Sequence, residues 1–257
     1  MTTSSSHEGV RTAKLRAKAI WAVWSDHCAK NGRGLFPVCS ITLAKEFGIK
    51  VAAADMEGDF QGALITASNG KSGILYNENI EPEGRVNFTV AHELGHFVLH
   101  KDRSDIRCSI EDIEGLGKAP HEDGIEKEAN TFSAELLMPY RFITQDMHGL
   151  NVTREILSSI TDKYGASLTA AACRVTELSS KPSAVIMLDN DNRCSWVFRN
   201  KKLYDFYIKK GDEVAFTENE NGATNVLSNK TWILTSDIID MPSFRKRMAL
   251  ISAEPRY

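Results

Sequence analysis

The feature that most constrains this chain is the motif H-E-x-x-H, present as His92, Glu93 and His96. Apolar residues recur at helical spacing through residues 85–100, so the spacing predicts a helix there. Residues four apart on a helix lie on one face about 6 Å apart, so both imidazoles can bind one metal ion. Glu93 would lie beside the open position of that ion, where a carboxylate can accept a proton from water. The motif therefore predicts a hydrolytic metal site.

A catalytic zinc ion usually takes three protein ligands, so a third ligand is needed. His100 continues the spacing, but eight residues of helix rise about 12 Å, too far for one ion to bridge. The sequence therefore favours His100 as a helix-end histidine near the C-terminal dipole. The longer H-E-x-x-H-x-x-G-x-x-H spacing is missing, which excludes a metzincin.

A second predicted helix, over residues 124–137, offers Glu126 and Glu128. The two glutamates lie about 200° apart around a helix, so only one can face the ion. Glu126 and Asn130 are four residues apart, so a ligand carboxylate can share its face with an amide that orients a ligand histidine. Spacing alone favours Glu126 only weakly over an ordinary solvated glutamate.

Residues 88–96 and 126–139 together resemble the ImmA/IrrE family of metallo-endopeptidases. The family pattern is F-T-x-A-H-E-x-G-H, followed by E-x-x-A-[ND]-x-F-A-x-x-L-L-M-P. The resemblance covers roughly residues 11–180. Ser133 stands where alanine is typical, which is a mild departure.

The resemblance implies a role for each motif residue. His92, His96 and Glu126 correspond to the metal ligands, and Glu93 corresponds to the general base. Asn130 holds the position one helical turn after the third ligand, where aspartate is also usual. Two histidines and a carboxylate suit zinc, although the same set can hold manganese or iron.

The resemblance also implies a class of substrate. Better-known members cleave a helix-turn-helix repressor that is often encoded by a neighbouring gene. The expected partner is therefore an Xre-like repressor or antitoxin, whose cleavage relieves repression. Two alternatives remain open: a non-proteolytic binding module, and a DNA-binding regulator that acts through residues 151–178.

We expect an α+β fold: a zincin-like metallopeptidase core with the active-site helix beside a small β-sheet, a helix-turn-helix-like helical segment, and a C-terminal α/β or mostly β domain. The expected boundaries are a flexible tail at residues 1–10, the peptidase at 11–145, the helical segment at 146–180, and a C-terminal α/β domain at 181–257, for which the resemblance implies a sensory or regulatory role. Asn69-Gly70 predicts a hairpin turn within residues 62–77.

The helical segment predicts two helices divided at residues 164–167. A recognition helix should present several basic or amide side chains to DNA, and this one offers Arg174 and little else. The formal net charge of −3 gives no further reason to expect nucleic acid. The sequence therefore favours a helical pair packed on the peptidase core over direct DNA binding.

Composition sets the broader limits. With 42% hydrophobic and 25% charged residues in 257, the chain is an ordinary globular protein. Its five cysteines are odd in number and form no C-x-x-C pair, so neither a disulfide framework nor a cysteine zinc site is expected. No signal peptide and no bilayer-length apolar run are present, so we expect a cytoplasmic protein with no membrane partner. The oligomeric state cannot be predicted from this sequence.

Three further segments bear on substrate binding. The hairpin at residues 62–77 either adds a peptide strand at its edge or is an ordinary structural hairpin. Residues 101–124 predict a mobile acidic loop that could cover the site and favour a basic substrate. His121 in this loop is either an oxyanion donor or, more simply, a surface histidine. The basic cluster at residues 245–247 predicts a solvated helix end.

Overall fold

A computed structural model describes residues 2–56, 58, 60–101, 106–109, 124–218, 224–226 and 230–256. The chain divides into two compact units. The N-terminal unit contains Met1–Pro139 together with Asp162–Ser167, and the C-terminal unit contains Tyr140–Thr161 together with Leu168–Tyr257. The fold is α+β, as expected, and the expected domain boundaries stay a prediction.

The N-terminal unit combines helices with a four-stranded sheet of order β1-β3-β2-β4. Strand β1 is parallel to β3, and the other two pairings are antiparallel. Its elements, in chain order, are α1 (Thr2–Lys30), α2 (Ser40–Glu46), β1 (Lys50–Ala54), β2 (Phe60–Thr66), β3 (Ser72–Asn77), α3 (Glu83–Leu99), β4 (Ile106–Ser109) and α5 (Gly124–Leu137).

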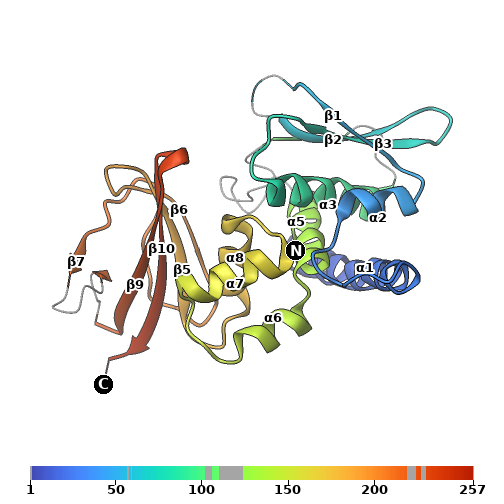
Figure 1. Cartoon of the computed structure of the whole chain (residues 1–257). Helices are drawn as coiled ribbons and strands as arrows, with labels where there is room; N and C mark the ends of the chain where they lie inside the picture. Colours follow the sequence, from blue (N-terminus) through green and yellow to red (C-terminus); the bar gives the residue numbers. More distant parts are fainter. Residues whose placement is uncertain are drawn as a thin grey trace. The chain divides into compact units, whose positions relative to one another are not determined.

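Helix α3 lies between the sheet on one side and α1 and α5 on the other (Figure 1). Its residues Val90 and Leu94 belong to a buried core that also includes Trp24, Ile74 and Phe132. This layering explains why one helix can hold a buried polar site: its two faces are covered by apolar packing from different elements. The expected arrangement of an active-site helix beside a small sheet is observed.

Helix α1 begins at Thr2, so the segment expected to be a flexible tail is helical. Serines and a glycine have low helix propensity, which is why the sequence alone predicts a tail. Packing against α5 overrides that propensity. Gly9 approaches the Glu128 carboxylate so closely that a side chain at this position would collide with it.

The predicted hairpin is formed by β2 and β3, and Gly70 adopts the left-handed conformation, with φ of +79°, in its turn. Both sides of the hairpin carry other strands of this chain, because β1 pairs with β3 and β4 pairs with β2. Among the described residues, β1 pairs along β3 and β4 pairs with β2 from Phe60 to Leu64, which favours the structural hairpin over peptide addition at these two strands.

The segment expected to be a loop, residues 101–124, contains strand β4. Four residues show too little alternation for a strand to be recognised among charged neighbours. The strand forms because its backbone pairs with β2. The remaining residues of the proposed lid, with His121 and the acidic side chains, lie outside the described residues.

The C-terminal unit contains a six-stranded antiparallel sheet of order β6-β5-β10-β9-β8-β7. Strand β5 is buried along its whole length. The described elements of residues 181–257 are strands and one 3-10 turn, which is the mostly β form of the expected domain and not an α/β form. The elements of the unit are α6 (Tyr140–Met147), α7 (Arg154–Tyr164), α8 (Leu168–Leu178), β5 (Ser183–Leu188), β6 (Cys194–Arg199), β7 (Phe216–Glu218), β8 (Thr224–Val226), β9 (Trp232–Met241), η1 (Pro242–Phe244) and β10 (Lys246–Pro255).

The two helices expected within residues 151–178 are α7 and α8, divided by Gly165, whose φ is +59°. The turn Asp162–Ser167 belongs to the N-terminal unit, where the Tyr164 ring packs on Phe36 with centroids 4.6 Å apart. Arg174 is only 2% exposed, and its guanidinium forms an ion pair with Glu177 at 2.8 Å. Arg174, the cationic residue that the sequence analysis considered as a DNA contact, is therefore buried.

Three further expectations concern the cysteines, membrane-spanning helices and the basic cluster near the C-terminus. All five cysteines are free thiols, so no disulfide is formed. Within the described part of the chain, no helix is both long and apolar enough to cross a membrane. In the cluster at residues 245–247, Arg245 is the C-cap of the short 3-10 helix η1, in a left-handed conformation, and Lys246 and Arg247 begin strand β10.

Candidate metal centre

The site is built where α3 and α5 approach each other closely. A Cβ at Gly95 would lie 3.0 Å from the Phe132 ring and 3.3 Å from the Ala129 Cα, both on α5. Since such distances are tighter than ordinary contact, a glycine at this position lets the two backbones come together. The close approach brings the face of α3 with His92 and His96 opposite the first turns of α5.

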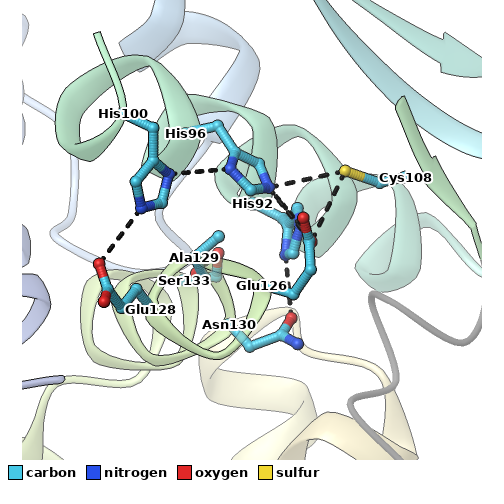
Figure 2. A network of polar contacts seen from close by, with 9 residues as sticks. All are labelled: His92, His96, His100, Cys108, Glu126, Glu128, Ala129, Asn130 and Ser133. Atoms are coloured by element: carbon cyan, nitrogen blue, oxygen red, sulfur yellow. Dashed lines mark hydrogen bonds and ion pairs between the residues drawn. The ribbon is translucent and has the colours of Figure 1, made fainter. Parts of the chain in front are cut away.

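Three donor atoms from these helices meet at one point (Figure 2). His92 Nε2 lies 3.0 Å from Glu126 Oε2, and His96 Nε2 lies 3.3 Å from the same oxygen. The two Nε2 atoms are 3.0 Å apart. Ligands bound about 2.0 Å from one tetrahedral ion lie about 3.3 Å from each other. The residues present therefore fit a single small metal ion.

Burial and charge also suit a cation. His92 and His96 have no exposed surface, and the Glu126 side chain is only 14% exposed. Burial would raise the pKa of Glu126, but hydrogen bonds with His92 and His96 outweigh it and hold the pKa of this carboxyl below its usual range. Burial lowers the pKa of His96, which favours the neutral ring that a metal ligand needs. These shifts favour an ionised Glu126 and a neutral His96 ring, whereas at His92 the effect of burial is outweighed by contacts that include the hydrogen bond with Glu126, which raise the pKa of His92.

The other nitrogen of each ligand histidine has its own partner, drawn in Figure 2. His92 Nδ1 lies 2.9 Å from Asn130 Oδ1. His96 Nδ1 lies 3.0 Å from His100 Nδ1, and His100 Nε2 lies 3.2 Å from Glu128 Oε2. His100 and Glu128 therefore face each other beside the centre, and Glu126 is the glutamate of α5 that faces the two histidines.

Glu93 is completely buried beside this cluster. Within the part of the chain that is described, neither of its carboxylate oxygens has a hydrogen bond of ordinary geometry. Burial raises the pKa of Glu93 to about 7, although His92, the Cys108 thiol and the Leu64 amide act in the opposite direction. A buried carboxylate without a partner is costly, so a cation or a bound water is expected to complete its surroundings.

Sequence reasoning missed Cys108. It lies outside both motifs, and the only signal near it is a short run of strand-compatible residues. In the structure its Sγ lies 3.6 Å from His96 Nε2 and 3.9 Å from Glu126 Oε2. Among the described residues, His92, His96, Cys108 and Glu126 form a group whose donor atoms all lie within 4.8 Å of one another.

The departure at Ser133 is accommodated locally. Its side chain is fully buried on α5, where a hydroxyl needs a partner. The hydroxyl donates to the Ala129 carbonyl of the preceding helical turn at 2.9 Å. The hydrogen-bonding requirement of the buried Ser133 hydroxyl is therefore met within α5 itself.

A buried group of histidines, glutamate and cysteine on an α+β fold suggests a metal-dependent enzyme. The sequence matches the peptidase family described as the IrrE N-terminal-like domain over residues 44–176, just over half of the chain. The chain therefore belongs to this family of metallopeptidases, and the expected resemblance is confirmed.

Two similar proteins give further context. The radiation response metalloprotease IrrE of Deinococcus radiodurans is 31% identical over 109 residues, which are 42% of this chain and 32% of that protein. The chain thus matches about a third of the length of this relative. A solved structure described as a Mycobacterium tuberculosis transcriptional regulator is 14% identical, with 96% of this chain and 81% of that chain covered and a TM-score of 0.49.

Proposed function

We propose that the protein is a zinc-dependent endopeptidase that cleaves a specific regulatory protein, a helix-turn-helix repressor of the Xre type or an antitoxin, and so relieves repression. The observation that carries this proposal is the convergence of His92, His96 and Glu126 donor atoms beside the buried Glu93 carboxylate. Membership of a metallopeptidase family supports hydrolysis of a protein substrate.

His92, His96 and Glu126 would hold the ion. Two imidazoles and one carboxylate suit zinc, and manganese is the second candidate for this set. When bound, zinc supplies a Lewis acid that makes water more acidic and a peptide carbonyl more electrophilic. Metal analysis of protein purified without chelator identifies the ion directly.

Glu93 would move the proton. A carboxylate whose pKa lies near 7 can accept a proton from water and return it to the leaving amine. Its burial against β2 excludes bulk water from one side of the site. Glu93 therefore acts as the general base and then as the general acid.

The substrate class is inferred from the family resemblance, and we place the reaction in the cytoplasm. We further propose that residues 146–180 form a helix-turn-helix-like segment and that residues 181–257 serve a sensory or regulatory role. Direct DNA binding is not part of the proposal, because the Arg174 side chain is buried and ion-paired.

The experiment compares wild type, Glu93→Gln and Glu83→Gln. Each protein is incubated with the repressors encoded near its gene, and the products are identified by mass spectrometry. Glu83 is exposed on the same helix, so Glu83→Gln is a matched control. We expect Glu93→Gln to retain the metal and lose about 10²–10⁴-fold in cleavage rate, as removal of a general base does.

Two results would contradict the proposal. If wild type with its metal bound cleaves none of these regulators, and protein termini mapped in host cells do not differ between wild type and Glu93→Gln, the protein is not an endopeptidase of this kind. If Glu93→Gln relieves repression as fully as wild type, the protein acts by binding and not by cleavage.

A further inference from the structure

Cys108 reaches the candidate metal centre from strand β4. It is completely buried, and its Sγ lies near donor atoms of two of the three expected ligands (Figure 2). None of the roles assigned so far to His92, His96, Glu126 and Glu93 uses this thiol.

The distances fit a thiolate on the same ion. For a sulfur ligand at about 2.3 Å and a nitrogen ligand at about 2.05 Å, a tetrahedral ion sets the two atoms about 3.6 Å apart. Cys108 Sγ lies 3.6 Å from His96 Nε2 and 3.9 Å from Glu126 Oε2. Cysteine and histidine are both common ligands of zinc, so the chemistry of this donor set agrees with its geometry.

The register of the sheet explains why the thiol points this way. Cys108 on β4 pairs with Gly62 on β2, and directly opposed residues of an antiparallel pair share one face of the sheet. That face is the one toward α3, because a Cβ at Gly62 would lie 2.8 Å from the Glu93 carboxylate and 2.8 Å from the Thr89 methyl group. The position of Cys108 is thus set by backbone pairing.

The second observation is Glu93 itself. Both of its oxygens are buried without a hydrogen-bond partner of ordinary geometry among the described residues. A group of four donors with an unpartnered carboxylate beside it is the arrangement expected where a cation belongs.

We propose that Cys108 is a fourth protein ligand of the metal ion held by His92, His96 and Glu126. The proposal rests on the proposed function only in requiring that metal site. Sites with four protein ligands are closed, whereas catalytic sites keep one position open. The described conformation is therefore a resting form, and the thiolate has to leave the ion before water and substrate share it.

The test uses the full chain, freed of metal and titrated with Co²⁺. Wild type is expected to bind one Co²⁺ ion. Its absorption spectrum should then show the visible bands typical of a four-coordinate site and a near-ultraviolet thiolate-to-cobalt charge-transfer band. Cys108→Ser is expected to retain Co²⁺ and lose the thiolate band. Cys28→Ser is the matched control, because Cys28 is similarly buried in the same unit but does not belong to the group of His92, His96, Cys108 and Glu126.

The outcomes separate this inference from the proposed function. Visible bands without a thiolate band in wild type would overturn the role of Cys108 and leave the three-ligand site intact. A thiolate band that persists in Cys108→Ser would also overturn it. Absence of any Co²⁺ binding by wild type would contradict the metal centre as a whole, and with it both proposals.

A second measurement does not depend on a variant that folds. X-ray absorption of zinc-loaded wild type is expected to show one sulfur neighbour at about 2.3 Å in addition to nitrogen and oxygen neighbours at about 2.0 Å. A first shell of nitrogen and oxygen alone would show that Cys108 does not bind the ion.

Discussion

His92 and His96, the two histidines proposed as metal ligands, are each oriented through the Nδ1 atom. Glu128 accepts a hydrogen bond from His100 Nε2–H, which leaves His100 Nδ1 to accept from His96 Nδ1–H. His92 Nδ1–H donates to the Asn130 oxygen in the same way. This assignment follows from the hydrogen-bond network, and it leaves the Nε2 lone pair of each ligand histidine directed at the centre.

Asn130 can be tested without changing a ligand. Asn130→Ala removes the acceptor of His92 Nδ1–H and is expected to weaken metal affinity by about 10–100-fold, as losses of such supporting contacts do. Asn130→Asp keeps an acceptor oxygen and is expected to stay close to wild type. Competition with a chromogenic chelator measures the affinity, and Asn79→Ala, at an exposed asparagine of the same unit, is the control. Equal affinities for Asn130→Ala and wild type would show that the contact does not orient the ring.

The residues of the site differed in how well they could be predicted. His92, Glu93 and His96 follow from local helical spacing, which a sequence carries directly. The choice of Glu126 over Glu128 needed the family resemblance, because the position of α5 against α3 is a tertiary property. Cys108 could not be found, since its place depends on the pairing of β4 with β2.

At the scale of elements, strand β2 packs closely against helix α3 at a residue that has no side chain. Gly62 lies against Glu93 and Thr89, and a Cβ there would be 2.8 Å from both side chains. The strand can therefore lie this close to the helix without displacing these side chains because the position is a glycine. The packing that buries Glu93 and the packing that holds the sheet on α3 are the same contact.

Gly62→Ala tests this contact. The added methyl group is expected to displace the Glu93 carboxylate, so the cleavage rate should fall at least about tenfold while metal content stays at wild-type level. Gly73→Ala in β3 is the matched control, because its Cβ would meet only the Lys50 carbonyl at an ordinary 3.5 Å. Cleavage by Gly62→Ala at the wild-type rate would show that Glu93 tolerates the displacement or does not act as the base.

The helices were easier to predict than the strands. The predicted helix at residues 124–137 coincides with α5, because its apolar spacing is clear and Met138-Pro139 closes it. Strand β4 and the start of β10 were predicted as a loop and a helix end. Both strands exist through pairing with distant partners, and this pairing is not encoded in the local spacing.

At the scale of the whole molecule, metal binding is expected to increase the stability of one unit only. All candidate ligands lie in the N-terminal unit, so a bound ion stabilises that unit by mass action. We expect zinc to slow hydrogen exchange in α3, α5 and β2, and to leave β5 and β10 unchanged. Mass spectrometry of exchange with and without zinc measures this, and the double variant His92→Ala/His96→Ala is the control. Slowed exchange throughout β5 and β10 would show that the two units respond as one.

The family match and the compact units have different boundaries. The match covers residues 44–176 and so continues through α6 and α7 and nearly to the end of α8, which lie largely in the C-terminal unit. The six-stranded sheet begins at Ser183, beyond the match. The family relationship therefore covers the metal centre and the helical segment and does not extend to the sheet.

The turn Asp162–Ser167 has a consequence for how such genes can recombine. The chain leaves the N-terminal unit after Pro139, returns at Asp162 and leaves again after Ser167. A single crossover after Pro139 would give a peptidase that lacks Tyr164 and leaves the Phe36 ring without that partner. A hybrid gene that keeps the whole N-terminal unit must therefore retain the coding sequence as far as Ser167, and this stretch includes helix α7.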